Sequence, residues 1–177
     1  LTIEDTDLPT PFAHTDKQQM ISLEEGVGKM RAALDARQDP NLVIVARTGA
    51  MGISDQDDAV RRVKAYEKSG VDALFLVNVR RREQLKAIYD AVSLPILMAH
   101  PGNELDLEFM QAHGVRICLQ MHLPILAALK TVHDTMKALR DGQDQEQLAR
   151  DVTAPELVKK TLRNDDYRRW IKTFLTP

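Results

Sequence analysis

Polar side chains capable of acid–base or metal chemistry end five apolar segments of this sequence. Each lies at or just after the end of a predicted strand; they are Glu4, Asp5, Arg47, Thr48, Asn78, His100 and His122. Arginine binds a carboxylate through two parallel hydrogen bonds, which fixes both its charge and its orientation. Carboxylates and water suit Mg²⁺ or Mn²⁺. The set is typical of a site where arginine holds an anionic substrate close to a divalent metal.

Each of these residues also has a purely structural interpretation. Glu4 and Asp5 could cap the loop that follows them. Arg47 ends a buried strand, where an unpaired charge is costly, so it is expected to bind a ligand or form an ion pair. His122, between a strand and a helix, could be structural, and His100 could be a turn residue. The sequence contains no zinc-type spacing of Cys and His, no Gly-x-Gly-x-x-Gly and no Walker loop.

The composition fits one globular domain or part of a larger one. The chain has 177 residues, 44% of them hydrophobic, and 24 Lys and Arg against 26 Asp and Glu. This near-neutral balance argues against nucleic-acid binding, and no apolar run approaches the roughly 18 residues of a membrane span. Cys118 is the one cysteine and cannot form an internal disulfide, so a cytoplasmic protein is expected.

Apolar runs alternate with amphipathic segments along most of the chain. Ser22 and Glu25 form a capping box that opens a helix, and Gly70 is a typical helix C-cap. Buried strands that alternate with helices predict right-handed crossovers and a parallel sheet. The predicted strands are 1–4, 42–46, 73–77, 95–99 and 115–121, and the predicted helices are 22–37, 54–69, one within 80–92, 105–113 and 123–140.

The last part of the chain is expected to be an appendage. Residues 1–140 are predicted to form a catalytic domain, residues 141–152 a polar linker and residues 153–175 C-terminal helices. The helix at 123–140 is expected to turn Ile125, Leu129, Val132 and Met136 inward. The apolar residues of the appendage should dock on the barrel or on a neighbouring subunit; they are Leu157, Leu162, Trp170, Ile171 and Phe174.

Five parallel strands fit two architectures. They could form a complete doubly wound domain, or the last five units of an eight-stranded barrel of about 250 residues. The chain opens on an apolar strand without an initiator methionine. That favours the barrel and suggests that residues before Leu1 are absent, although periodicity alone does not decide.

Several motifs, taken together in their order along the chain, resemble those of a known family. They are Ile3-Glu4-Asp5, residues 23–25 and 29–33, Ile44-Val45-Ala46-Arg47-Thr48 and residues 65–75. Together they resemble the isocitrate lyase/phosphoenolpyruvate mutase superfamily over nearly the whole chain. Gly114-Val115-Arg116 and His122 are most similar to its oxaloacetate decarboxylase branch.

The resemblance implies a (βα)₈ barrel assembled as dimers of dimers, with Leu1 at the fourth strand. The chain would then be the C-terminal five βα units, strands 4–8, with a helical appendage. The aspartate nearest to Mg²⁺ and a substrate-binding serine would belong to the absent first three units. Glu4 corresponds to an acid that reaches the metal through water, Arg47 to an arginine that binds a substrate carboxylate, and His122 to a histidine that contacts the substrate. His100 is a further candidate for substrate binding.

The resemblance further implies Mg²⁺-dependent decarboxylation of oxaloacetate, a small 2-oxo dicarboxylate, to pyruvate and CO₂. The C–C lyases of the superfamily carry a catalytic cysteine in the loop after the Ile-Glu-Asp strand, whereas residues 7–21 contain none. Two alternatives remain at this stage. One is a C–C lyase or a phosphoenolpyruvate or phosphonate enzyme on the same scaffold. The other is an inactive fragment that lacks the first three βα units.

Overall fold

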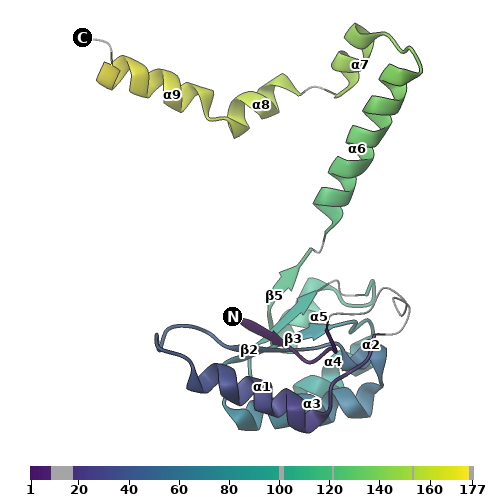
Figure 1. Cartoon of the computed structure of the whole chain (residues 1–177), viewed down its shortest axis with the longest axis vertical. Helices are drawn as coiled ribbons and strands as arrows, with labels where there is room; N and C mark the ends of the chain where they lie inside the picture. Colours follow the sequence, from purple (N-terminus) through teal and green to yellow (C-terminus); the bar gives the residue numbers. More distant parts are fainter. Residues whose placement is uncertain (9–17, 100–101, 121, 153, 176–177) are drawn as a thin grey trace. The chain divides into compact units, whose positions relative to one another are not determined.

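The computed structural model describes residues 1–8, 18–99, 102–120, 122–152 and 154–175 (Figure 1). Strands and helices alternate through the first part of the chain, and helices alone follow. The elements are β1 (Thr2–Glu4), α1 (Leu23–Asp35), β2 (Val45–Thr48), α2 (Ala50–Ile53), α3 (Gln56–Ser69), β3 (Ala73–Val77), α4 (Arg82–Tyr89), β4 (Ile96–Ala99), α5 (Leu107–Ala112), β5 (Val115–Leu119), α6 (Leu123–Arg140), α7 (Gln145–Val152), α8 (Pro155–Thr161), α9 (Asn164–Trp170) and η2 (Ile171–Leu175).

The five described strands form one parallel sheet in the order β1-β2-β3-β4-β5. Every strand therefore lies beside its neighbour in sequence. A doubly wound sheet reverses its strand order at a switch point, whereas a barrel keeps the order of the chain. The order thus supports the expected barrel-like arrangement, and the structure shows a part of one.

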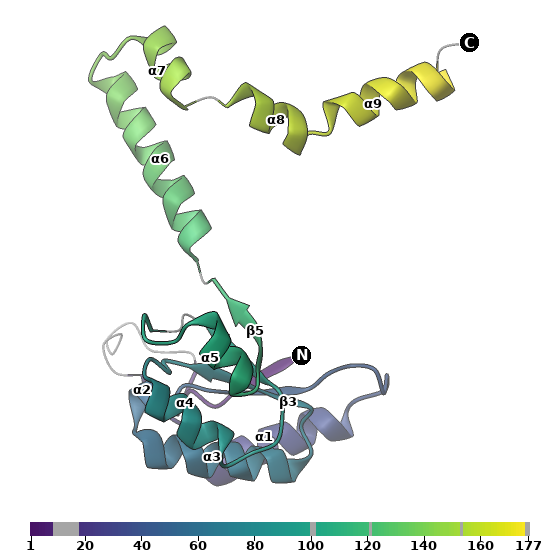
Figure 2. The same cartoon turned by 180° about the vertical axis from the view of Figure 1, so that it is seen from behind.

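Helices cover one face of the sheet. Helices α1, α3 and α4 lie beneath the strands in Figures 1 and 2. Side chains alternate between the two faces of a strand. Leu74, Leu76, Ile96 and Met98 are buried under the helices, whereas Phe75 and Leu97 are only partly buried on the opposite face.

The local sequence signals form as expected at several element ends. The Ser22 hydroxyl accepts a hydrogen bond from the Glu25 backbone N–H at 3.1 Å. Asp55, which was not predicted as a cap, caps α3 in the same way through the Asp58 N–H at 2.7 Å. Gly70 ends α3 with φ at +95°, a conformation that glycine adopts without strain.

The second strand is displaced from its prediction. It was expected at 42–46, but β2 is Val45–Thr48 and Leu42 and Val43 are exposed. The Leu42 N–H bonds to the Asp39 carbonyl in a turn, and the Ile44 N–H bonds to the Asp72 carboxylate at 2.7 Å. A turn and a side-chain acceptor therefore take up these two N–H groups, and the strand begins at Val45.

Two helices were not predicted. The short helix α2 follows β2 directly, where a loop was expected. Helix α7 occupies most of the segment 141–152 that was expected to be a polar linker. The Asp144 carboxylate accepts a hydrogen bond from the Gln147 N–H at 2.8 Å, and Leu148 is buried. An N-terminal cap and one buried leucine therefore order a segment whose composition is polar.

The chain divides into two compact units, residues 1–121 and 122–177. Helix α6 belongs to the second unit by its contacts within the chain, whereas the predicted boundary lies at 140/141. The helices expected over 153–175 are present as α8, α9 and η2. Among the described helices, none combines the length and apolar character needed to cross a membrane.

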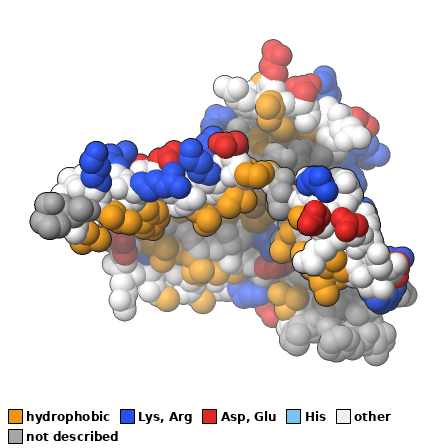
Figure 3. Space-filling model, turned by 90° about the horizontal axis from the view of Figure 1, so that it is seen from above, with side chains coloured by type: hydrophobic (Ala, Val, Ile, Leu, Met, Phe, Trp, Pro, Cys, Tyr) orange, Lys and Arg blue, Asp and Glu red, His pale blue; other side chains and the backbone are white. Residues whose placement is uncertain are grey.

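The second unit exposes most of its apolar side chains. Every residue of α6 is exposed or partly exposed, and Ile125, Leu129, Val132 and Met136 are each more than half exposed. These four residues were expected to face inward, whereas within the second unit their side chains are exposed. Figure 3 shows apolar side chains gathered along one side of the helices of this unit.

Candidate active site

Glu4 and Arg47 meet where β1 and β2 end. Their Cα atoms are register partners on the adjacent parallel strands, and Glu4 Oε2 lies 3.2 Å from Arg47 Nη1. The Thr6 hydroxyl donates a hydrogen bond to Glu4 Oε1 at 3.0 Å. Both side chains are partly exposed on the face of the sheet that the helices leave uncovered. The structure therefore brings together two of the predicted site residues as an ion pair.

The next strand places an aromatic ring beside the guanidinium. Phe75 is the register partner of Arg47 on β3, and the Arg47 Cζ atom lies 5.4 Å from the ring centroid. This distance permits a cation–π attraction. Arg47 Nε is buried and has no hydrogen-bond partner among the described residues. Glu4 thus uses only part of the five-donor capacity of the guanidinium, which leaves it able to bind an anion.

Asp5 lies on the opposite face from Glu4. Its side chain is fully buried and accepts hydrogen bonds from Tyr66 Oη at 2.7 Å and Arg62 Nη1 at 3.4 Å. Burial and the Asp5 charge together raise the pKa of Tyr66 above its ordinary range, so its phenol stays a hydrogen-bond donor. Asp5 was predicted to lie together with Glu4 and Arg47 at the ends of the strands. This prediction is wrong, because alternation along the strand turns the Asp5 side chain to the other face of the sheet.

Close backbone approaches join the loops at the same edge of the sheet. Asn78 has φ at +65°, and a Cβ atom at Gly52 would lie 2.6 Å from the Asn78 Cβ. A Cβ atom at Gly102 would lie 2.9 Å from the Arg80 Cα. Helix α2, which contains Gly52, and the loops after β3 and β4 are therefore packed against one another at these glycines. The Thr48 hydroxyl accepts a hydrogen bond at 3.2 Å from the N–H of Ala50, the first residue of α2.

Two histidines, His100 and His122, were also predicted to contact the substrate. His100 lies outside the described residues. His122 precedes α6 at the start of the second unit and is exposed. Its role stays a prediction.

The described residues supply only part of the oxygen ligands that Mg²⁺ requires. Among the described residues, no group of three or more His, Cys, Asp or Glu could hold a metal ion. The Glu4 carboxylate is an oxygen donor of the kind that Mg²⁺ prefers. Its two oxygens already contact Thr6 and Arg47, so it fits a contact through a water molecule better than direct ligation. The described residues therefore fit one supporting part of a magnesium site.

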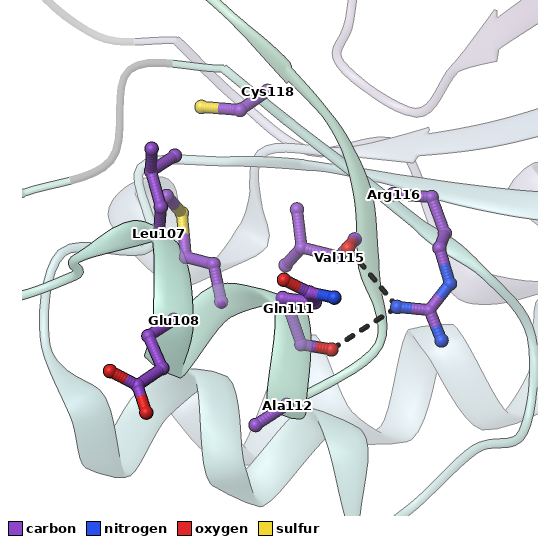
Figure 4. A pocket seen from close by; sticks show the side chains of 8 residues that line it. Leu107, Glu108, Gln111, Ala112, Val115, Arg116 and Cys118 are labelled. Carbon is purple, nitrogen blue, oxygen red and sulfur yellow. Dashed lines mark hydrogen bonds between the residues drawn. The ribbon is translucent and has the colours of Figure 1, made fainter.

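A groove of about 880 Å³ lies elsewhere, between α5 and β5. Figure 4 shows its lining and the Arg116 guanidinium turned back onto the Gln111 and Val115 carbonyls, at 3.1 and 3.2 Å. Burial raises the pKa of the Cys118 thiol, which lowers its thiolate fraction. Neither Glu4 nor Arg47 lines this groove.

The strands keep the order of the chain, and an acid and an arginine lie at their carboxyl ends, where α/β barrels carry their active sites. Residues 1–140 match the model of the phosphoenolpyruvate phosphomutase family. The chain belongs to this family, which confirms the resemblance seen in its motifs.

Individual proteins are also similar to this chain in sequence or in structure. The chain is 47% identical over 176 residues to an oxaloacetate decarboxylase of Bradyrhizobium sp. (strain ORS 278), covering 99% of this chain and 60% of the relative. It thus spans about 60% of the length of that relative. The crystal structure of a phosphoenolpyruvate phosphomutase from Streptomyces platensis subsp. rosaceus superposes with a TM-score of 0.77 at 22% identity, covering 99% of this chain and 63% of that one. A phosphonopyruvate hydrolase complex with oxalate and Mg²⁺ gives 0.72 at 23% identity, covering 99% and 62%.

Proposed function

We propose that the protein catalyses the Mg²⁺-dependent decarboxylation of oxaloacetate to pyruvate and CO₂. The observation that carries the proposal is the pairing of Glu4 with Arg47 at the carboxyl ends of adjacent strands, 3.2 Å apart. The 47% identity to an oxaloacetate decarboxylase supports the choice of reaction. The absence of cysteine from residues 7–21 favours decarboxylation over cleavage of a hydroxy diacid.

Arg47 is the residue that binds a carboxylate of the substrate. Its guanidinium can donate two parallel hydrogen bonds, which fixes the direction of the C–C bond to be broken. Glu4 and Phe75 hold the guanidinium from two sides before the substrate arrives. His122 and His100 are proposed as further substrate contacts.

Mg²⁺, or Mn²⁺, supplies a Lewis acid that draws electrons from the keto group when it is bound. Glu4 would help to hold the metal through a water molecule, and Thr6 fixes one of its carboxylate oxygens. The remaining ligands are proposed to lie outside these residues. We assign β1–β5 to strands 4–8 of an eight-stranded barrel, so that further ligands belong to strands 1–3. The unbroken strand order and the coverage of about 60% of the relatives support this assignment.

The protein is further proposed to be a cytoplasmic homo-oligomer, a dimer or tetramer. The support is the exposed apolar side of α6, together with the exposed apolar residues of α8, α9 and η2. Extended exposed apolar patches are typical of protein–protein interaction sites. A second copy of the chain, with the same apolar faces, can cover them.

The test is a product analysis with a panel of acids. The purified protein is incubated with Mg²⁺ and oxaloacetate, a 2-hydroxy diacid or phosphonopyruvate, and products are followed by NMR. We expect pyruvate and CO₂ from oxaloacetate, and little change in the other two acids. Cleavage of the hydroxy diacid or phosphonopyruvate without turnover of oxaloacetate would assign the protein to another reaction of the same family.

A further inference from the structure

We propose that Tyr66 and Arg62, on α3, are positioning residues for the active site. They bind Asp5 and so hold the end of β1 in the orientation that turns Glu4 toward Arg47. Neither residue touches the site itself. The inference rests on the proposed function, because it concerns how the Glu4–Arg47 pair is kept in place.

The contacts to Asp5 are entirely buried. Asp5 and Tyr66 are 0% exposed and Arg62 is 5% exposed. Tyr66 Oη donates to Asp5 Oδ2 at 2.7 Å, and Arg62 Nη1 lies 3.4 Å from the same oxygen. A hydrogen bond to an ionised group is roughly twice as strong as one between neutral groups. Asp5 Oδ1 is buried and already has no hydrogen-bond partner among the described residues, so loss of a donor to Oδ2 leaves the carboxylate with still fewer partners and gives the chain around Asp5 reason to shift.

Arg62 also fixes the backbone next to Asp5. Its Nη2 donates to the Ile21 carbonyl at 2.8 Å, and the Ile21 N–H donates to the Asp5 carbonyl at 3.0 Å. The Asp58 carboxylate holds Arg62 Nε at 2.9 Å, which orients the guanidinium toward both. One side chain therefore binds the chain where it leaves β1 and where it returns before α1.

The link from Asp5 to Glu4 is covalent and short. Adjacent side chains of a strand point to opposite faces, so a rotation of the backbone at Asp5 displaces the Glu4 carboxylate as well. Thr6, the following residue, donates to Glu4 Oε1 and is itself buried. Displacing a catalytic group by about 1 Å can cost as much as a hundredfold in rate. The buried cluster is therefore able to control the rate from the far face of the sheet.

Gly26 supports the specific placement of the Tyr66 hydroxyl. A Cβ atom at Gly26 would overlap the Tyr66 Oη and lie 3.2 Å from its Cε1. Gly26 is the fourth residue of α1, and glycine within a helix lowers its stability, so its presence needs a reason. The reason visible here is the space that the tyrosine takes as it reaches Asp5.

The first experiment compares Tyr66→Phe with Val63→Ala in the intact protein. Both residues are buried on α3, but Val63 makes no contact with Asp5 by hydrogen bonding and serves as the control for a general loss of packing. We expect Tyr66→Phe to lower kcat about tenfold with KM changed less than about threefold, and Val63→Ala to keep kcat within about twofold. Equal kcat in the two folded variants would overturn the proposal.

The second experiment is a double-mutant cycle of Tyr66→Phe with Glu4→Gln. If Tyr66 acts through Glu4, Tyr66→Phe will lower kcat much less in the Glu4→Gln background than in the wild type. Fully additive losses would show that the tyrosine affects the rate by another route and would overturn the proposal.

Turnover by the wild type separates this inference from the proposed function. If the wild type does not decarboxylate oxaloacetate, the proposed function fails, and the positioning role is then measured by calorimetry with oxalate and Mg²⁺. We expect weaker oxalate binding in Tyr66→Phe than in Val63→Ala. Equal affinity in the two variants, or no binding by the wild type, would overturn the inference as well.

Discussion

Glu4 and Arg47 are register partners on adjacent parallel strands, and their charged groups meet 3.2 Å apart where both strands end. The carboxylate therefore holds the guanidinium in place before any substrate binds. An arginine whose rotamer is already fixed loses less conformational entropy when it binds a carboxylate. This relationship makes the pair a prepared anion site on the uncovered face of the sheet.

Replacing Arg47 by lysine should lower kcat/KM for oxaloacetate about a hundredfold, because a lysine keeps the charge but loses the planar two-point geometry. Steady-state kinetics with Mg²⁺ measure the effect. Arg37→Lys is the matched control, since Arg37 pairs with Asp72 at 2.9 Å and lies at the opposite end of the strands. A near-normal kcat/KM in Arg47→Lys would remove Arg47 from the site.

Two glycines of α1 should respond in opposite directions to alanine. Gly26→Ala should destabilise the protein by about 1–3 kcal/mol, because the new methyl group meets the buried Tyr66 ring. Gly28→Ala should stabilise it by about 0.5–1 kcal/mol, since no atom lies within 4 Å of its Cβ position. Denaturant unfolding monitored by circular dichroism gives both free energies. Equal effects of the two changes would contradict the close approach of Tyr66.

Acid should weaken the fold in part through Asp58. Burial opposes ionisation of Asp58, but the hydrogen bond and charge of Arg62, with the charge of Arg61, outweigh it and hold its pKa below the ordinary value. A carboxyl whose pKa is lowered by folding contributes stability above its unfolded pKa of about 3.9 and loses it as the pH falls through the lower folded value.

The free energy of unfolding should therefore fall less steeply with pH below about 4 in Asp58→Asn than in the wild type. Chemical denaturation at a series of pH values measures the slopes. Asp90→Asn, which removes an exposed pair with Lys86, is the control and should keep the wild-type slope. A slope in Asp58→Asn as steep as that of the wild type would contradict the contribution of the Asp58–Arg62 pair.

The apolar side of α6 should lie in a subunit interface. Sedimentation should give a mass above that of a single chain for the wild type, and Leu129→Lys should shift it toward the monomer, because burying the new charge in an interface is costly. Leu129 is 59% exposed in the single chain. Lys130→Ala changes the neighbouring exposed residue and should leave the mass unchanged. A monomeric wild type would contradict the proposed assembly.

Local signals made much of the fold predictable. Ser22, Asp55 and Gly70 mark helix ends through contacts within a few residues, and the structure confirms the two that were predicted, Ser22 and Gly70. Glu4 and Arg47 could be predicted to lie close together because each ends a strand and parallel strands end at one edge. Helix α7 was not predicted, because its polar composition is typical of a linker. The cap that Asp144 provides at its start was not recognised.

The buried cluster behind the site was not predictable from local pattern. Tyr66 lies at an apolar position of the helical pattern, which predicts a core residue. In the structure its hydroxyl binds Asp5, which is 61 residues away in sequence. Asp5 lies beside Glu4 in sequence, and only the alternation of the strand places it on the other face. Contacts between residues so distant in sequence leave no periodic signal.

The central claim is tested most directly by the rate of pyruvate formation from oxaloacetate by the wild-type protein with Mg²⁺, compared with Mg²⁺ alone and with protein plus EDTA. We predict saturable turnover well above the protein-free rate with Mg²⁺, and loss of that turnover with EDTA. A rate with protein and Mg²⁺ that equals the rate with Mg²⁺ alone would contradict the proposed function.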